Sequence, residues 1–191
     1  REAEDIVDLA HQLQAAHRLP GPVYLLGASY GATVALYAAA KLPQVHGVIA
    51  LEPYVDAAAV IRRAPASGLF GYKWLAAWLS PQRMDKAIAR ASRKLGVDLF
   101  HLDPGDALAQ TTACTLILRG TDDGLIPDAA LRALDQRSAR ASYVEIPDEG
   151  HLTLPLRSDR LFPPLLDWIA ALPGDSGNCP EFTPLPFTAT P

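Results

Sequence analysis

The chain has 191 residues, of which 49% are hydrophobic and 20% are charged, and its formal net charge is −4 at pH 7. This composition fits one globular core, and the mildly acidic balance offers no electrostatic footprint for nucleic acid. No apolar run approaches the roughly 18 residues that a membrane-spanning helix needs. Because the sequence opens on Arg1 instead of methionine, we draw no conclusion about export, and localisation stays open.

The first segment predicts one amphipathic helix that ends at Leu19-Pro20-Gly21. Its first turn is acidic, and proline followed by glycine is a stop signal. The apolar side chains recur at helical spacing along one face: Ile6, Leu9, Ala10, Leu13 and Ala16.

A strand over Val23–Leu26 then leads directly into Gly27-Ala28-Ser29-Tyr30-Gly31, and a helix over Gly31–Lys41 follows. This order is typical of a nucleophile elbow, a tight strand-to-helix turn that projects the serine hydroxyl above the sheet. We expect Gly27 and Gly31 to remove side chains that would collide in the turn. A G-x-S-x-G match alone also occurs by chance, so its meaning depends on the rest of the chain.

The next strand is predicted over Gly47–Leu51, and Glu52 follows it. An excursion over residues 53–110 is too long for an ordinary loop, and it contains two helical patterns. The first is an aromatic stripe that could line an acyl pocket, although packing within the excursion is the simpler interpretation: Phe70, Trp74 and Trp78. The second stripe is Met84, Ile88, Ala91 and Leu95. Its helix has a basic face, which is expected to be solvated or to attract an anionic substrate: Arg83, Lys86, Arg90, Arg93 and Lys94.

Two more strands are predicted downstream, each followed by a chemically informative loop. The strand at Thr115–Leu118 ends at Gly120 and leads into Asp122-Asp123-Gly124-Leu125-Ile126-Pro127. The strand at Ser142–Ile146 leads into a loop that ends in Gly150-His151.

A last helix is predicted from Ser158 to Leu172, with Pro163 and Pro164 tolerated only in its first turn. Residues 173–191 are rich in proline and lack periodicity, so we expect them to be disordered. Cys114 begins a buried strand and Cys179 lies in this tail, which suggests neither a disulfide framework nor a metal site.

The order Ser29, Asp123, His151, with each residue after a strand, resembles the α/β-hydrolase family over about residues 1–172. The resemblance implies that Ser29 is the nucleophile, His151 the general base and Asp123 the acid that orients it. It also implies that the backbone N–H of Tyr30 belongs to the oxyanion hole. Asp122 and Glu52 are the alternative acids, and for Glu52 a solvated carboxylate is the simpler interpretation. The remaining histidines are expected to have no catalytic role: His11, His17, His46 and His101.

The resemblance implies a mostly parallel sheet flanked by helices, an α/β fold. Its nucleophile-bearing core would occupy residues 1–52, a helical lid 53–110, and the part of the core with acid and histidine 111–172. In the family several strands precede the nucleophile, whereas here only 28 residues precede Ser29. We therefore expect a C-terminal portion of such a hydrolase, without the early strands and the second oxyanion donor.

The predicted activity is cleavage of a carboxylic ester or related acyl bond of a small molecule through an acyl-serine intermediate. A serine aminopeptidase of the same fold and a catalytically inert binding module are the alternatives. No cofactor, metal or nucleic-acid partner is expected. Acyl length, ester or peptide preference and oligomeric state stay open at this point.

Overall fold

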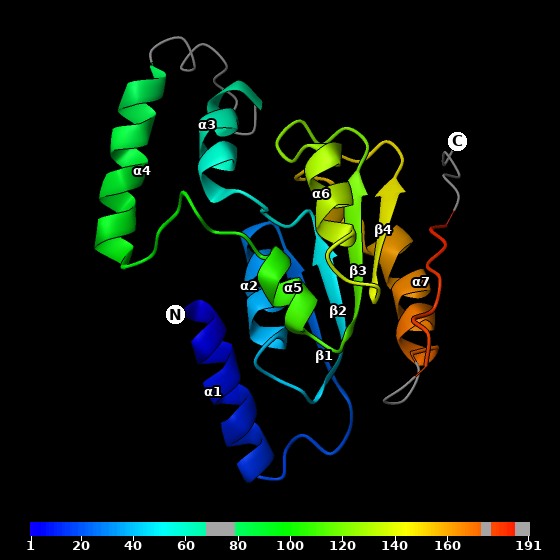
Figure 1. Ribbon diagram of the computed structural model, residues 1–191. Coiled ribbons are helices and arrows are strands. Elements are labelled where there is room, and N and C mark those ends of the chain that lie inside the picture. Colours follow the sequence, from blue (N-terminus) through cyan, green and yellow to red (C-terminus); the bar gives the residue numbers. More distant parts are fainter. Residues whose placement is uncertain (68–78, 173–176, 186–191) are drawn as a thin grey trace.

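The computed structural model describes residues 1–67, 79–172 and 177–185, and its centre is a sheet of four parallel strands (Figure 1). The strands lie in chain order, so β1 and β4 form the two edges. Parallel neighbours require crossover connections, which are helical here. The predicted α/β class is confirmed. The strands are β1 (Val23–Ala28), β2 (Val45–Leu51), β3 (Cys114–Gly120) and β4 (Ala141–Ile146).

Helices cover both faces of the sheet because the inner strands are apolar on both sides. Successive side chains of a strand point to opposite faces. Ile117 accordingly packs in one core, whereas Leu116 and Leu118 pack in the other. Residues of α7 (Ser158–Ala170) contribute to the second core. The first core includes residues of α1 (Glu2–Ala15), α2 (Tyr30–Ala39), α5 (Gly105–Gln110) and α6 (Asp128–Asp135).

Helix α1 follows the predicted pattern only in part. It ends at Ala15, and its buried residues are Ala3 and Ala10, whereas Leu9 is 54% exposed. The inward side of the helix therefore combines the buried Ala3 and Ala10 with the partly buried Ile6 and Val7. None of the helices in the described part of the chain is both long and apolar enough to cross a bilayer.

The described part of the excursion over residues 53–110 contains α5, which packs in the first core, and two helices beyond the carboxyl end of the sheet, α3 (Ala57–Ser67) and α4 (Pro81–Leu95) (Figure 1). Helix α4 begins after Ser80, whose hydroxyl accepts the Arg83 N–H, and ends at Gly96, which has a φ of 68°. Its predicted stripe supplies the buried Ile88, and its five basic residues are exposed. The sequence pattern missed α3, and the predicted aromatic stripe lies outside the described residues.

The C-terminal region differs from the prediction in three ways. Pro163 and Pro164 lie in the second turn of α7, beyond the first turn that we expected. Cys114 and Cys179 form a disulfide, so the expectation of unpaired cysteines is wrong. Residues 177–185, which we had predicted to be disordered, pack against α7. Phe182 is buried, and Trp168 of α7 donates its indole N–H to the Pro180 carbonyl. Apolar anchors and a covalent link outweigh the polar composition of this segment.

Candidate active site

Each strand of the sheet is followed by one polar residue of the candidate site, and all four residues lie at the carboxyl end of the sheet. Ser29 directly follows β1 and Glu52 directly follows β2. Asp123 comes three residues after the end of β3, and His151 comes five residues after the end of β4. Parallel strands all have their carboxyl ends on the same side of a sheet, and four side chains distant in sequence therefore converge there.

Ser29 occupies the apex of the turn between β1 and α2. Its φ of 56° and ψ of −123° are unusual for a residue with a side chain and match the strained apex of a nucleophile elbow. Its N–H is held by the Leu51 carbonyl at 2.7 Å. The two glycines differ: a Cβ on Gly27 would lie 2.3 Å from the Gly31 carbonyl oxygen, whereas a Cβ on Gly31 would meet nothing within 4 Å. Only Gly27 is needed for close approach, which corrects our expectation for Gly31.

Ser29, His151 and Asp123 form one hydrogen-bonded series. The Ser29 hydroxyl lies 2.8 Å from Nε2 of His151, and Nδ1 of His151 lies 2.9 Å from Oδ2 of Asp123. An imidazole in this position can take the serine proton through Nε2, while a carboxylate at Nδ1 fixes the tautomer and stabilises the imidazolium. The arrangement is thus suited to nucleophilic catalysis by the serine.

The Asp123 loop is held from two sides. Oδ1 of Asp123 accepts the backbone N–H groups of Leu125 at 2.7 Å and Ile126 at 3.0 Å, which leaves Oδ2 for His151. Burial acts to raise the pKa of Asp123, but the hydrogen bonds from His151 and these amides outweigh it and lower the pKa below its ordinary value. The alternative acid Asp122 is exposed.

Buried Arg119 of β3 holds the backbone of the Asp123 loop, a role that was not predicted from the sequence. Its guanidinium donates to the carbonyl oxygens of Asp123 at 2.8 Å and Ile126 at 3.0 Å, and to the carboxylate of Glu145 at 3.1 Å. A single charged residue inside the otherwise apolar strand Thr115–Gly120 was the available signal, since buried arginines need partners.

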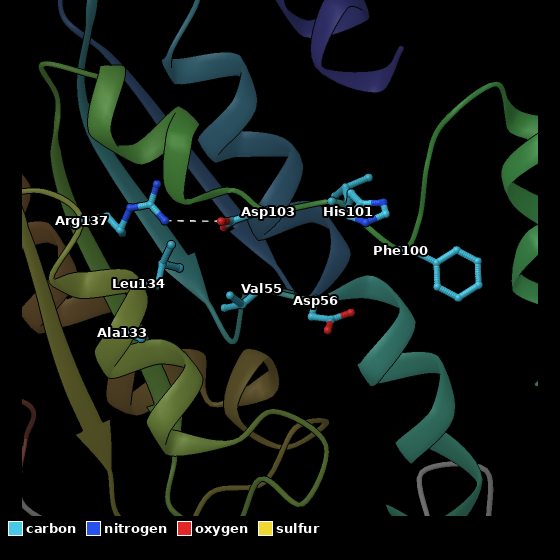
Figure 2. Close-up of a pocket in the computed structure, with 9 residues that line it drawn as sticks. Val55, Asp56, Phe100, His101, Asp103, Ala133, Leu134 and Arg137 are labelled. Atoms are coloured by element: carbon cyan, nitrogen blue, oxygen red, sulfur yellow. Dashed lines mark hydrogen bonds and ion pairs between the residues drawn. The ribbon is translucent and has the colours of Figure 1, made fainter. Parts of the chain in front are cut away.

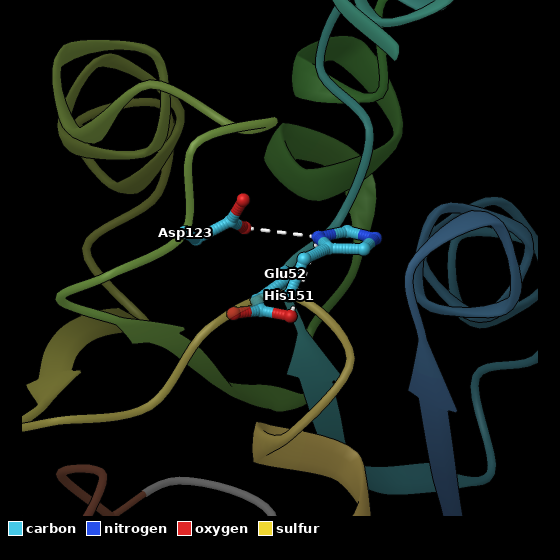
Figure 3. A group of neighbouring side chains, drawn as sticks. All are labelled: Glu52, Asp123 and His151. Carbon is cyan, nitrogen blue, oxygen red and sulfur yellow. Dashed lines mark hydrogen bonds and ion pairs between the residues drawn. The ribbon is translucent and has the colours of Figure 1, made fainter. Parts of the chain in front are cut away.

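Glu52 is fully buried, which contradicts the expectation of a solvated carboxylate. Its Oε2 lies 3.3 Å from Nδ1 of His151, farther than Oδ2 of Asp123 (Figure 3). Burial and the neighbouring charge of Asp123 raise the pKa of Glu52 to about 8. One donor atom from each of Glu52, Asp123 and His151 lies within 4.8 Å of the others. Nδ1 of His151 is engaged by Asp123, and we therefore read the group as part of the serine site and not as a metal site.

A third buried acid, Glu149, anchors the loop that carries His151. Its carboxylate accepts hydrogen bonds from Arg157 at 3.1 Å and from Arg160 at 2.7 Å, which ties the loop to the region where α7 begins. This group was not predicted, although two arginines shortly after an Asp-Glu-Gly-His loop are a recognisable sequence pattern.

A cavity of about 390 Å³ opens beside Ser29 and His151. Its other walls are apolar, formed by Tyr54, Leu152, Pro155 and Leu156. A second cavity, of about 440 Å³, lies between α6 and the segments next to Asp56 and Asp103 (Figure 2). Ser29 and His151 do not line it, and its cation Arg137 is paired with Asp103, so it is not part of this site.

The predicted oxyanion donor Tyr30 is the first residue of α2, where backbone N–H groups have no partner within the helix. The other histidines lie elsewhere. His46 is on β2 at the end opposite Glu52, and His101 pairs with Asp98 at 2.7 Å. His11 is on α1 and His17 shortly follows it.

Comparison of the whole chain with solved structures shows the same fold at low identity. Rv0554 of Mycobacterium tuberculosis gives a TM-score of 0.60 at 18% identity over 90% of this chain and 73% of its own. A thermophilic esterase from Thermogutta terrifontis gives 0.58 at 21% identity over 89% and 71%. E-2-(acetamidomethylene)succinate hydrolase gives 0.59 at 22% identity over 88% and 74%.

Sequence comparison identifies the family. No curated protein sequence matches the chain significantly. A family model described as the alpha/beta hydrolase family, however, matches residues 1–162, and this range contains every residue of the site described above. The chain therefore belongs to the alpha/beta hydrolase family.

Proposed function

We propose that this hydrolase is a serine enzyme that cleaves carboxylic esters or related acyl bonds through an acyl-Ser29 intermediate. The observation that carries the proposal is the hydrogen-bonded series from the strained Ser29 through His151 to Asp123. A buried serine–histidine contact alone would be weaker support. The backbone strain at Ser29 and the acid on the far side of the imidazole both have a place in nucleophilic catalysis by serine, and they add to the support that the contact gives.

In the proposed reaction, Oγ of Ser29 attacks the substrate carbonyl carbon while Nε2 of His151 accepts the hydroxyl proton. The carbonyl π electrons move to oxygen, and the Tyr30 N–H is placed to donate to the resulting oxyanion. His151 then gives the proton to the leaving alcohol as the carbon–oxygen bond breaks. Water repeats the sequence on the acyl-enzyme, and it releases the acid and the free serine.

The apolar cavity beside Ser29 supports an uncharged substrate. Three side chains in its wall are hydrocarbon in character, Leu152, Pro155 and Leu156, and Tyr54 adds an aromatic surface. An apolar acyl or alcohol group would gain from burial against them, whereas a charged group would lose hydration without a partner.

The excursion over residues 53–110 is proposed to act as a lid. Helices α3 and α4 lie beyond the carboxyl end of the sheet, the end at which Ser29 and His151 lie (Figure 1). Arg62 of α3 and Asp85 of α4 are joined by an ion pair at 2.7 Å, so the two helices are linked to each other. A segment so placed can control access of substrate and water to the serine.

Labelling with a fluorophosphonate probe tests the proposal directly. The wild-type chain should acquire the probe at Ser29 by mass spectrometry, and Ser29→Ala should not. Turnover of p-nitrophenyl esters against aminoacyl p-nitroanilides then distinguishes an esterase from an aminopeptidase. Absence of labelling in a correctly folded chain would favour the catalytically inert binding module.

A further inference from the structure

Glu52 is a buried carboxyl group whose two oxygens have unequal surroundings. Oε1 accepts the backbone N–H of Gly120 at 3.1 Å. Oε2 is buried and has no hydrogen-bond partner among the described residues, although it lies 3.3 Å from Nδ1 of His151. An ionised carboxylate oxygen left in this state would be costly, because nothing replaces the water that it loses on burial.

The charged groups that face Glu52 compensate a second negative charge only in part, through the charge of Arg119. From β3, the guanidinium of Arg119 is directed to the carbonyl oxygens of Asp123 and Ile126 and to Glu145. From the loop after β4, His151 offers a single Nδ1 hydrogen, which the closer Asp123 takes. From the loop after β3, Asp123 is itself an anion. Two carboxyl groups at one site favour a state in which only one ionises.

We propose that Glu52 stays protonated while the enzyme works and that its carboxyl O–H donates a hydrogen bond to Asp123. Glu52 is then a positioning residue for the acid of the triad. A proton on Oε2 of Glu52 gives this oxygen the hydrogen-bond partner that it lacks. Oδ2 of Asp123 then accepts a second hydrogen bond besides that from His151, which keeps Oδ2 in place against the imidazole. This inference rests on the proposed serine mechanism for its effect on activity, but not for the protonation state itself.

The directions of the pKa shifts of Glu52 and Asp123 agree with a protonated Glu52 beside an ionised Asp123. Burial and the charge of Asp123 raise the pKa of Glu52 to about 8, and the proposed hydrogen bond to Asp123 would act the same way because it requires the proton. The pKa of Asp123 is lowered. Glu52 would therefore be neutral and Asp123 ionised at pH 7. Above about pH 8, loss of the Glu52 proton places two buried carboxylates in contact, and their repulsion weakens the hold of Asp123 on His151.

Glu52→Gln and Glu52→Ala test this role through kcat/KM for a p-nitrophenyl ester. Glutamine keeps the shape and an N–H donor toward Asp123, so it should cost less than about tenfold at pH 7. Alanine removes the proposed hydrogen bond to Asp123 and leaves the Gly120 N–H without its acceptor, and displacement of the triad should cost about 100-fold. Exposed Glu181→Gln is the matched control for the loss of one carboxyl group. A loss for Glu52→Gln as large as that for Asp123→Asn would overturn the proposal, because Glu52 would then be needed as an anion.

The pH profile provides a readout that a merely structural role would not move. Wild-type kcat/KM should fall above about pH 8, and in Glu52→Gln this alkaline fall should disappear. Persistence of the same fall in Glu52→Gln would contradict the proposal.

A titration of the Glu52 side-chain carboxyl carbon by ¹³C NMR, assigned by its absence in Glu52→Gln, needs no substrate. The carbon should report a protonated group at pH 7. If it reports a carboxylate, the proposal fails even when the enzyme is active. If the chain shows no serine reactivity while the carbon still reports a protonated group, the proposed function fails but the protonation of Glu52 stands.

Discussion

Gly120 and Glu149 meet backbone to backbone under the candidate site. A Cβ on Gly120 would lie 2.0 Å from the carbonyl oxygen of Glu149. That oxygen also accepts the N–H of Asp122 at 2.9 Å. Gly120 ends the strand that leads to Asp123, and Glu149 begins the turn that carries His151. The two loops that hold the acid and the histidine are therefore set against each other by a residue without a side chain.

Gly120→Ala should damage stability and activity together. The clash is with backbone and not with a flexible side chain, so one loop must move, and such overpacking typically costs about 1–3 kcal/mol of the free energy of unfolding. A shift of about 1 Å between Asp123 and His151 should lower kcat/KM by about 100-fold. Urea denaturation and an ester assay measure the two effects.

Gly124→Ala is the matched control for this substitution. A Cβ at Gly124 would meet nothing within 4 Å, although the residue is next to Asp123 in the same loop. Its unfolding midpoint and kcat/KM should stay near those of the wild type. Equal damage by both substitutions would show that the loop is sensitive to any added methyl group, and the contact of Gly120 with Glu149 would not be the cause.

The strands, and the positions of Ser29, Asp123 and His151 after three of them, could be predicted from the sequence because they depend on local signals. Apolar runs that end at glycine or acidic turns indicate buried strands, and G-x-S-x-G between a strand and a helix indicates the elbow. The prediction failed for Glu52, whose burial depends on tertiary structure and not on local sequence. Glu52 next to Pro53 looks like a surface residue, and only the register of β2 beside β3 brings it under Gly120.

The disulfide could not be inferred for a related reason. Cys114 begins a central strand, and Cys179 lies 65 residues later in a segment whose composition favours disorder. Their proximity depends on the course of the chain after α7, which brings Phe182 and Pro180 against Trp168. No local pattern encodes that return. By contrast, the burial of Arg119 could have been suspected, because its strand is otherwise apolar.

The choice of acid is tested by Asp123→Asn and Asp122→Asn. Asparagine at position 123 keeps the shape but favours the wrong tautomer of His151, and in other triads the corresponding change costs about 10⁴-fold in kcat. Asp122 is exposed, whereas Asp123 is the residue that pairs with Nδ1 of His151, so Asp122→Asn should cost less than about threefold. Steady-state kinetics with one ester substrate compares them. If the two losses were similar, Asp123 would not be the acid.

The Ser29 and His151 pair should behave as a unit. Ser29→Ala and His151→Ala should each remove nearly all ester turnover, and the double variant should be little worse than either, because each variant already abolishes the same step. Circular dichroism should show that all three remain folded. Ester turnover near the wild-type level in His151→Ala would contradict the assignment of the general base.

The Cys114–Cys179 disulfide should contribute strongly to stability. It closes a loop with a sequence separation of 65, and loop-closure entropy predicts about 4 kcal/mol for a loop of this size. Cys179→Ala should lower the free energy of unfolding by an amount of this order, and dithiothreitol should destabilise the wild type to the same level without affecting the variant. Thiol titration of the unreduced, denatured chain should find no free thiol. Two free thiols in that titration would contradict the link.

The exposed edge of the sheet at β1 should drive self-association of the 191-residue chain. β1 pairs only with β2 among the described strands, and its sequence contains neither charge nor proline, the features that usually protect an edge. Leu26 on this strand is 53% exposed. Analytical ultracentrifugation should therefore show concentration-dependent association, and Leu26→Lys should reduce it. Leu166→Lys is the matched control, because Leu166 is 61% exposed but lies on α7, where no strand edge is available. Equal reduction by both lysines would assign the association to general surface hydrophobicity, and a wild-type monomer at every concentration would show that the β1 edge is protected.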